Sequence, residues 1–148
     1  GPLSLPEYLQ RPQMVTRTSS SRLQYHDQHR WAEPLADNIG RVLRENLAGL
    51  LDIEQVLTWP WPRSRVVDYQ VIVEITRFDA DSTGTVNLEG HWSLQKPDGS
   101  VLIAGRHFTH NVPVEGASPD AVAVAHGEAL SRLAGEIAAA SVKTVSAQ

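Results

Sequence analysis

Apolar and polar residues alternate along the middle of the chain, between Arg65 and Val112, with the period of two that is typical of β-strands. Three consecutive strands are predicted in this stretch. The first strand places on one face Val67, Tyr69, Val71, Val73 and Ile75. The second strand places on one face Val86, Leu88, Trp92 and Leu94. Strands that are apolar on one face predict an antiparallel meander, which another layer of structure has to cover.

The second and third strands are joined by Lys96-Pro97-Asp98-Gly99, a turn sequence in which proline presets φ and glycine accepts a positive φ. A three-residue loop flanked by Lys96 and Ser100 then fixes the register between the two strands. In this register the facing pairs are Leu94 with Leu102, Trp92 with Ala104, Gly90 with Arg106, and Leu88 with Phe108. The same register makes His91 and His107 diagonal neighbours on the polar face.

Two amphipathic helices are predicted, one before and one after the meander. The first covers Pro34–Leu51 and repeats apolar residues at helical spacing. It is expected to bury against the sheet Leu35, Ile39, Val42, Leu43 and Leu47. The second begins with Ser118 as N-cap and Pro119 in the first turn, and its tail after Lys143 is expected to fray. Its apolar stripe consists of Val122, Ala125, Ala129, Leu133, Ile137 and Ala140.

Shorter elements are predicted in the rest of the chain. Gln13–Thr18 and Arg22–Arg30 are typical of a hairpin, Leu5–Pro12 of an irregular turn, and Ile53–Leu57 of a short strand. This order of elements favours an α+β fold, a two-layer sandwich of a mainly antiparallel β-sheet with two amphipathic helices. No repeat or linker divides residues 1–148, which predicts a single domain.

The composition excludes several classes of function. The chain of 148 residues is 41% hydrophobic and 20% charged, which is ordinary for a globular protein. A net charge of −4 without a basic run argues against a nucleic-acid partner. The absence of cysteine excludes disulfides, thiolate metal sites and a thiol nucleophile. No apolar run reaches the roughly 18 residues of a membrane span, and the opening Gly1–Ser4 is typical of a tag-cleavage remnant.

Six histidines are the first candidates for metal ligands, but their spacing along the chain does not favour a site. His26-x-x-His29 and His107-x-x-His110 lie on predicted strands, where residues i and i+3 point to opposite faces. Neither pair can converge on one metal ion, whereas helical spacing would allow it. We therefore expect no metal and no cofactor, and we expect chelator treatment to leave the melting temperature unchanged.

Acidic residues were the second set of candidates. Asp79–Gly84 resembles the opening of an EF-hand loop, but position 12 is Gly90 instead of the bidentate glutamate. A tight connection between strands is predicted there. Glu74 and Glu89 could form a carboxylate pair, but alternating acids on strands usually mark the solvated face. No nucleophile and base, phosphate-binding glycine loop or redox motif is present, so we predict no catalytic residues and no enzyme.

Two stretches are candidates for contact with a partner. Trp59-Pro60-Trp61-Pro62 places two large aromatic side chains on a proline-stiffened loop. The Leu5–Pro12 segment carries a short apolar cluster around two prolines. Either set of side chains can close an end of the core or anchor a partner surface. The predicted interface residues are Leu5, Tyr8, Leu9, Trp59 and Trp61.

The order of motifs resembles the PqiC-type family of ABC transport auxiliary lipoproteins. The resemblance rests on Leu5–Arg17, on Arg30–Leu35 with the leucine-rich helix behind it, and on Gly90-His91-Trp92, and it covers essentially the whole chain. It implies a non-enzymatic periplasmic protein, tethered to the outer membrane through a lipidated N-terminal cysteine and forming a homo-oligomer. It also implies lipid transport between membranes, in support of envelope integrity, beside an MCE-domain protein and the subunits of an ABC transporter in the inner membrane.

The chain departs from this family pattern in two ways. The lipobox cysteine is absent, and so is the strand that usually precedes Leu5–Leu9, so we expect a portion of a longer lipoprotein. A stand-alone periplasmic lipid- or small-molecule-binding module, with a pocket between helices and sheet, is the alternative. A hydrolase is a third hypothesis, for which no active residues can be named. An accessory subunit should self-associate or bind an MCE protein, whereas a carrier should be a monomer with a deep apolar pocket.

Overall fold

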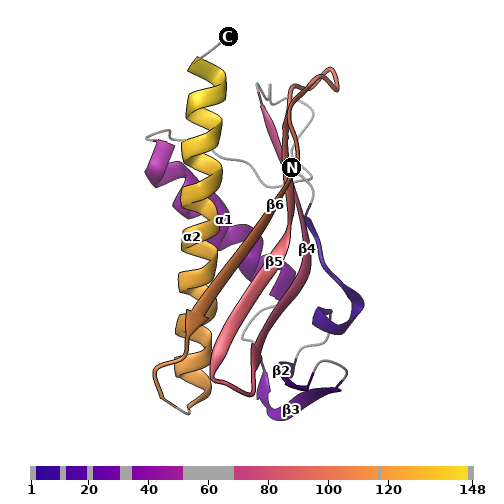
Figure 1. Ribbon diagram of the computed structural model, residues 1–148, viewed down its shortest axis with the longest axis vertical. Coiled ribbons are helices and arrows are strands. Elements are labelled where there is room, and N and C mark those ends of the chain that lie inside the picture. The colour runs from indigo at the N-terminus through magenta and orange to yellow at the C-terminus, as the bar shows by residue number, and fades with distance from the viewer. Residues whose placement is uncertain are drawn as a thin grey trace.

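The computed structural model describes residues 3–10, 13–19, 22–30, 35–51, 69–116 and 118–146. Their elements are β1 (Leu3–Ser4), the 3-10 helix η1 (Glu7–Leu9), β2 (Gln13–Ser19), β3 (Arg22–Arg30), α1 (Leu35–Leu51), β4 (Gln70–Asp81), β5 (Thr85–Gln95), β6 (Val101–Pro113) and α2 (Pro119–Ser146). The strands form one sheet, and α1 and α2 cross each other on one side of it (Figure 1). This is the predicted α+β fold. The predicted strand Ile53–Leu57 lies outside the described residues, and the single domain stays a prediction.

The sheet combines an antiparallel meander with a parallel edge. Its order is β3-β2-β4-β5-β6, and β1 also pairs with β4. β1 runs parallel to β4 at Leu3 and Val73, and β2 runs parallel to β4 at Thr16 and Ala80. The N-terminal chain therefore follows one edge of β4, with η1 between its two pairing segments. The expectation that no strand precedes Leu5 was wrong, because β1 occupies that place.

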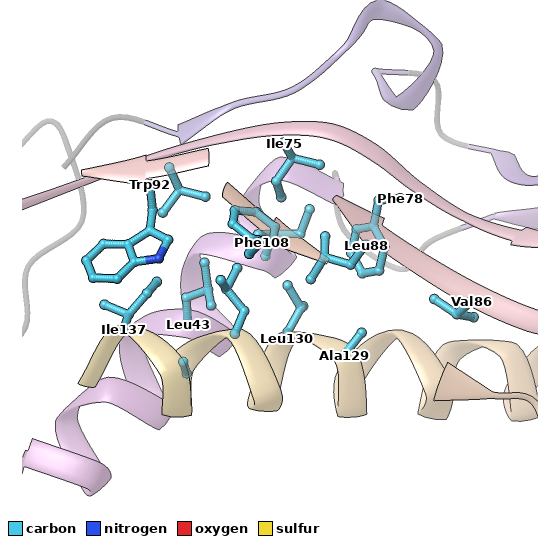
Figure 2. Close-up of a cluster of buried hydrophobic side chains, with 14 of the residues drawn as sticks. Leu43, Ile75, Phe78, Val86, Leu88, Trp92, Phe108, Ala129, Leu130 and Ile137 are labelled. Carbon is cyan, nitrogen blue, oxygen red and sulfur yellow. The ribbon is translucent and has the colours of Figure 1, made fainter. Parts of the chain in front are cut away.

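The core lies between the sheet and the helices. Side chains that are less than 2% exposed include Ile39, Ile75, Phe78, Val86, Leu88, Trp92, Phe108, Leu130, Leu133 and Ile137. Figure 2 shows Leu43 of α1, Ile137 of α2 and Trp92 of β5 meeting in the same space. The predicted apolar faces of β5 and α1 are the buried ones, although Val42 is only partly buried. No helix in the described part of the chain is long and apolar enough to cross a membrane.

The second helix begins as predicted and ends later. The backbone N–H of Ala121 donates to Ser118 Oγ at 3.1 Å, which is the expected N-cap. The buried face is wider than the predicted stripe, because α2 contacts β5, β6 and α1. It additionally contains Leu130, Ala134 and Ala138. The expected fraying after Lys143 was wrong, since the helix continues to Ser146.

The β5–β6 hairpin starts in the predicted register and then slips by two residues. The N–H of Lys96 donates to the carbonyl of Ser100 at 2.9 Å, and Gln95 faces Val101 as expected. Two bulges in β6 then change the pairing, and Gly105 adopts a φ of 32° in the second of them. The observed pairs are Leu94 with Ile103, Trp92 with Arg106, Gly90 with Phe108, and Leu88 with His110. The predicted register is therefore wrong beyond the turn.

Gly90 of β5 is closely approached by both neighbouring strands, β4 and β6. On one side, a Cβ on Gly90 would collide with the carbonyl oxygen of Glu74 in β4, next to the bulge between Ile75 and Arg77. From the other side, a Cβ on Gly90 would lie 2.8 Å from Cζ of Phe108. The absence of a side chain at this position therefore makes room for both the backbone of β4 and the Phe108 ring.

Substitution of Leu43 by alanine tests which face of α1 is buried. Its side chain is 6% exposed and packs in the core, so Leu43→Ala is expected to lower the free energy of unfolding by about 2–5 kcal/mol. Leu50→Ala on the same helix is the matched control, since Leu50 is 57% exposed, and its effect should stay within about 0.5 kcal/mol. Denaturant titration measures both. A loss below about 1 kcal/mol for Leu43→Ala would mean that another face is buried.

Candidate interface around the N-terminal segment

The Leu5–Gln10 segment forms one turn of 3-10 helix against the edge of β4. Pro6 precedes the turn in an extended conformation, with φ −66° and ψ 156°, which proline adopts readily. The N–H of Leu9 donates to the carbonyl of Pro6 at 3.1 Å, and the N–H of Gln10 donates to the carbonyl of Glu7 at 3.0 Å. This turn places Tyr8 and Leu9 next to each other facing the protein.

The predicted interface residues differ in how deeply they are buried. Leu9 is 3% exposed and belongs to the core of its own chain, so it offers almost no surface to a partner. Its inclusion among the interface residues is therefore not supported by its position, because the fold already uses it. Leu5 and Tyr8 are partly buried against the same core. Trp59 and Trp61 lie outside the described residues, so their interface role stays a prediction, as does that of Leu5 and Tyr8.

Tyr8 completes the hydrogen bonding of β4 on the edge opposite β5, between the positions where β1 and β2 pair with it. The N–H of Phe78 donates to the Tyr8 hydroxyl at 2.9 Å, and that hydroxyl donates to Asp79 Oδ2 at 2.7 Å. β1 pairs at Val73 and β2 at Ala80, so the hydroxyl fills the gap between them. Burial, together with the neighbouring Asp79 carboxylate, raises the pKa of Tyr8 well above its usual range. The phenol therefore remains a donor.

Asp79 is the buried centre of a partly buried ionic cluster. It is 0% exposed although it falls on the polar face of β4. Its Oδ2 lies 3.3 Å from Arg17 Nε, and its Oδ1 lies 3.4 Å from Arg77 Nε. Arg77 also reaches Glu89 at 3.5 Å, and the Arg17 guanidinium lies 5.6 Å from the centre of the Tyr8 ring. Two cations therefore balance two carboxylates, which lets the Asp79 charge remain buried.

His126 of α2 lies on the core side of the same strand. Its ring packs against Phe78 with 4.4 Å between ring centres, and its Nδ1 lies 2.8 Å from the carbonyl oxygen of Val122. Burial lowers the pKa of His126 from 6.5 to about 4. The neutral imidazole therefore donates Nδ1–H to that carbonyl. The stability it contributes is present above pH 6.5 and is lost as the pH falls towards 4.

The aspartate-rich turn is a tight strand connection, as predicted. Asp81 Oδ1 accepts hydrogen bonds from the N–H groups of Thr83 at 2.9 Å and Thr85 at 3.2 Å, and Asp81 Oδ2 accepts one from Asn87 at 2.9 Å. Burial opposes the charge of Asp81, but these hydrogen bonds outweigh it and lower the pKa of Asp81 to about 2. The carboxylate is therefore used to hold the turn. Glu74 faces His91 across the sheet and does not pair with Glu89.

A second polar cluster connects α2 to the meander. Trp92 Nε1 donates to Glu136 Oε2 at 2.9 Å, and His110 Nε2 lies 3.3 Å from Glu136 Oε1. The Arg106 guanidinium lies 5.6 Å from the centre of the Trp92 ring. As predicted for strand spacing, His110 faces the helix side while His107 is exposed on the other face. In the part of the chain that the structure describes, no group of three or more His, Cys, Asp or Glu side chains is placed to hold a metal ion.

Comparison with known proteins agrees with this architecture. No curated protein matches the chain. A solved structure described as an uncharacterized protein has 22% sequence identity and a TM-score of 0.80, and the match covers 92% of this chain and 85% of that one. Protein XCC0632 from Xanthomonas campestris, described as a DUF330 protein, has 23% identity and a TM-score of 0.77, over 98% of this chain and 85% of that one. These likenesses show a shared fold.

The sequence itself matches a family model with a functional description. Residues 1–138 match the family described as ABC-type transport auxiliary lipoprotein component. The match includes the N-terminal segment with Tyr8, the Asp79 cluster, the Gly90-His91-Trp92 motif and most of α2. The chain therefore belongs to the ABC-type transport auxiliary lipoprotein family.

Proposed function

We propose that the protein is a non-enzymatic accessory lipoprotein of an MCE/ABC-type lipid transport system. In this role it stands in the periplasm, tethered to the outer membrane by an N-terminal lipid anchor. It supports lipid trafficking between the inner and outer membranes beside an MCE-domain protein and its ABC transporter. The observation that carries the proposal is the family match over residues 1–138.

The polar clusters of the structure support a non-enzymatic role. Asp79 is engaged by Tyr8, Arg17 and Arg77, and the second cluster joins Glu136 to Trp92. These groups are paired with one another by hydrogen bonds and ion pairs, which connect the N-terminal segment, the sheet and α2. A catalytic acid or base would instead need a free face towards a substrate.

The alternative is a stand-alone periplasmic carrier of a lipid or small molecule. Its ligand would lie between the helices and the sheet. In the described residues, large side chains occupy this space, among them Trp92, Phe78 and Phe108, each 2% exposed or less (Figure 2). This packing favours the accessory subunit over a carrier with a pocket there.

Capture of the native lipidated protein distinguishes the two functions. Cells that produce the full-length lipoprotein are cross-linked, and the purified protein is analysed by mass spectrometry for both proteins and extracted lipids. An accessory subunit should capture an MCE-domain protein with little stoichiometric lipid. A monomer that carries one lipid per chain and captures no MCE protein would instead identify the carrier.

Substitution of Trp59 and Trp61 tests whether these two side chains bind a partner. If these side chains anchor a partner, Trp59→Ser with Trp61→Ser should leave the melting temperature nearly unchanged and weaken self-association or capture of the MCE protein. Trp92→Ser is the control for a core tryptophan, since Trp92 is 1% exposed, and it should unfold the protein. Thermal melts and sedimentation measure both effects. If the double variant unfolds like Trp92→Ser, the two side chains close the core and the interface assignment is wrong.

A further inference from the structure

Two histidines face each other on the solvent-exposed side of the sheet. His91 of β5 and His107 of β6 are direct partners in the register, and both side chains are exposed. Their ring centres are 5.2 Å apart, and the ring planes are inclined by 70°. Directly opposite residues of an antiparallel pair project to the same face. These two imidazoles therefore converge, whereas those of His107 and His110 diverge.

The spacing of the two rings matches that of imidazoles that share one metal ion. A histidine nitrogen binds Zn²⁺ at about 2.0–2.1 Å in tetrahedral geometry, which places the centres of two bound rings about 5 Å apart. The ring centres of His91 and His107 already have this separation, at 5.2 Å. Both side chains are exposed, so rotation about their χ angles can direct one nitrogen of each ring to a common point.

The charges around the pair are compatible with a cation. Glu74 of β4 faces His91 from the other neighbouring strand, so that Glu74, His91 and His107 form a row across three strands. Two arginines of the same strands have partners of their own: Arg106, next to His107 in the chain, lies over Trp92, and Arg77 of β4 pairs with Asp79 and Glu89. The candidate ligands are therefore the two imidazoles, of the ligand type that suits divalent transition metals, and the Glu74 carboxylate is a negative charge in the same row.

We propose that His91 and His107 form a surface site for a divalent transition-metal ion of the zinc class. The two imidazoles are its protein ligands, water completes the coordination, and Glu74 lies beside it as a compensating charge. This site is additional to the proposed transport function. It arises from the two-residue slip of β6, because the register expected from the turn leaves the two histidines diagonal.

The site adds metal binding without making the fold depend on metal. Its ligands lie on two strands that are already paired along their length, and both side chains are exposed. Removal of metal should therefore leave the protein folded, in contrast to closed structural sites with four ligands.

Titration of the full chain with ZnCl₂ tests the proposal. Isothermal titration should show one site. His91→Gln and His107→Gln should each weaken binding at least tenfold, because loss of a direct ligand should lower metal affinity more than loss of an outer-shell partner, which typically lowers it 10–100-fold. Ring resonances of both histidines should shift together on addition of Zn²⁺. His26→Gln with His29→Gln is the matched control and should retain the affinity. Melting temperatures establish that each variant is folded.

Three results would overturn this assignment. The wild-type chain could fail to bind Zn²⁺, or either single variant could bind as tightly as the wild type. Binding could also disappear in the His26→Gln, His29→Gln control and persist in the other variants, which would place the metal on β3 instead.

Discussion

Gly90→Ala is expected to be the most damaging conservative substitution in the protein, with a loss of about 5 kcal/mol in the free energy of unfolding. The added methyl group would meet the carbonyl oxygen of Glu74 and come within 2.8 Å of the Phe108 ring. Backbone on one side and a buried aromatic ring on the other leave no direction for relaxation. Such a loss consumes much of the stability of a typical domain, so the variant is expected to accumulate unfolded or aggregated.

The matched control comes from glycines in open surroundings. Gly127→Ala and Gly135→Ala place the same methyl group in α2, where no atom lies within 4 Å of the new Cβ. These substitutions should stabilise the helix by up to about 1 kcal/mol. Denaturant titration measures all three variants. If Gly90→Ala lost less than about 1 kcal/mol, the close approach of β4 to β5 would be wrong.

Asp79→Ala is expected to lower the free energy of unfolding by about 3–5 kcal/mol, because it removes the common partner of a buried charge cluster. Arg17 and Arg77 would lose the carboxylate that balances them, and the Tyr8 hydroxyl would lose its acceptor. The side chains of Arg17 and Arg77 are 21% and 29% exposed, so water can compensate part of the loss. The lower half of the range is therefore expected.

A second substitution shows whether the cluster acts as a unit. Tyr8→Phe alone should cost about 1–3 kcal/mol, since it leaves the Phe78 N–H without its acceptor, and it should add little to Asp79→Ala. Asp98→Ala, in the exposed β5–β6 turn, is the control and should have a clearly smaller effect than Asp79→Ala. Equal effects of Asp79→Ala and Asp98→Ala would contradict the buried cluster.

The sequence predicted the elements of the fold more accurately than the pairing between them. Periodicity located β2, β3, α1, β5 and the start of α2, because it records which side chains are buried. The turn at Lys96–Ser100 was also correct, since proline and glycine restrict its conformation. The register of β6 was wrong because its two bulges add up to a slip of two residues, which returns the side chains beyond Gly105 to their predicted faces. Beyond the bulges burial therefore could not distinguish the two pairings, and Gly105 was a local sign of a bulge.

The candidate site was less predictable than the fold. Tyr8 and Asp79 are 71 residues apart in the chain, and Arg17 and Asp79 are 62 apart. An aspartate at the end of a polar strand face gives no sign that two arginines will cover it. Leu9 was assigned to a partner surface for a related reason: an apolar residue between prolines looks the same whether it binds another protein or its own core. Only the path of the N-terminal chain along β4 distinguishes these cases.

That path has a consequence for the newly synthesised chain. Leu3, Leu5 and Leu9 are synthesised well before the strand that covers them, which begins at Gln70. At about 5–20 residues per second, these side chains stay uncovered for several seconds. β4, β5 and β6 follow one another through short turns, so they can assemble without the N-terminal segment, which has to close a long loop before it docks. This N-terminal segment is therefore made before β4 but protected after it, and this interval is when a chaperone would be needed most.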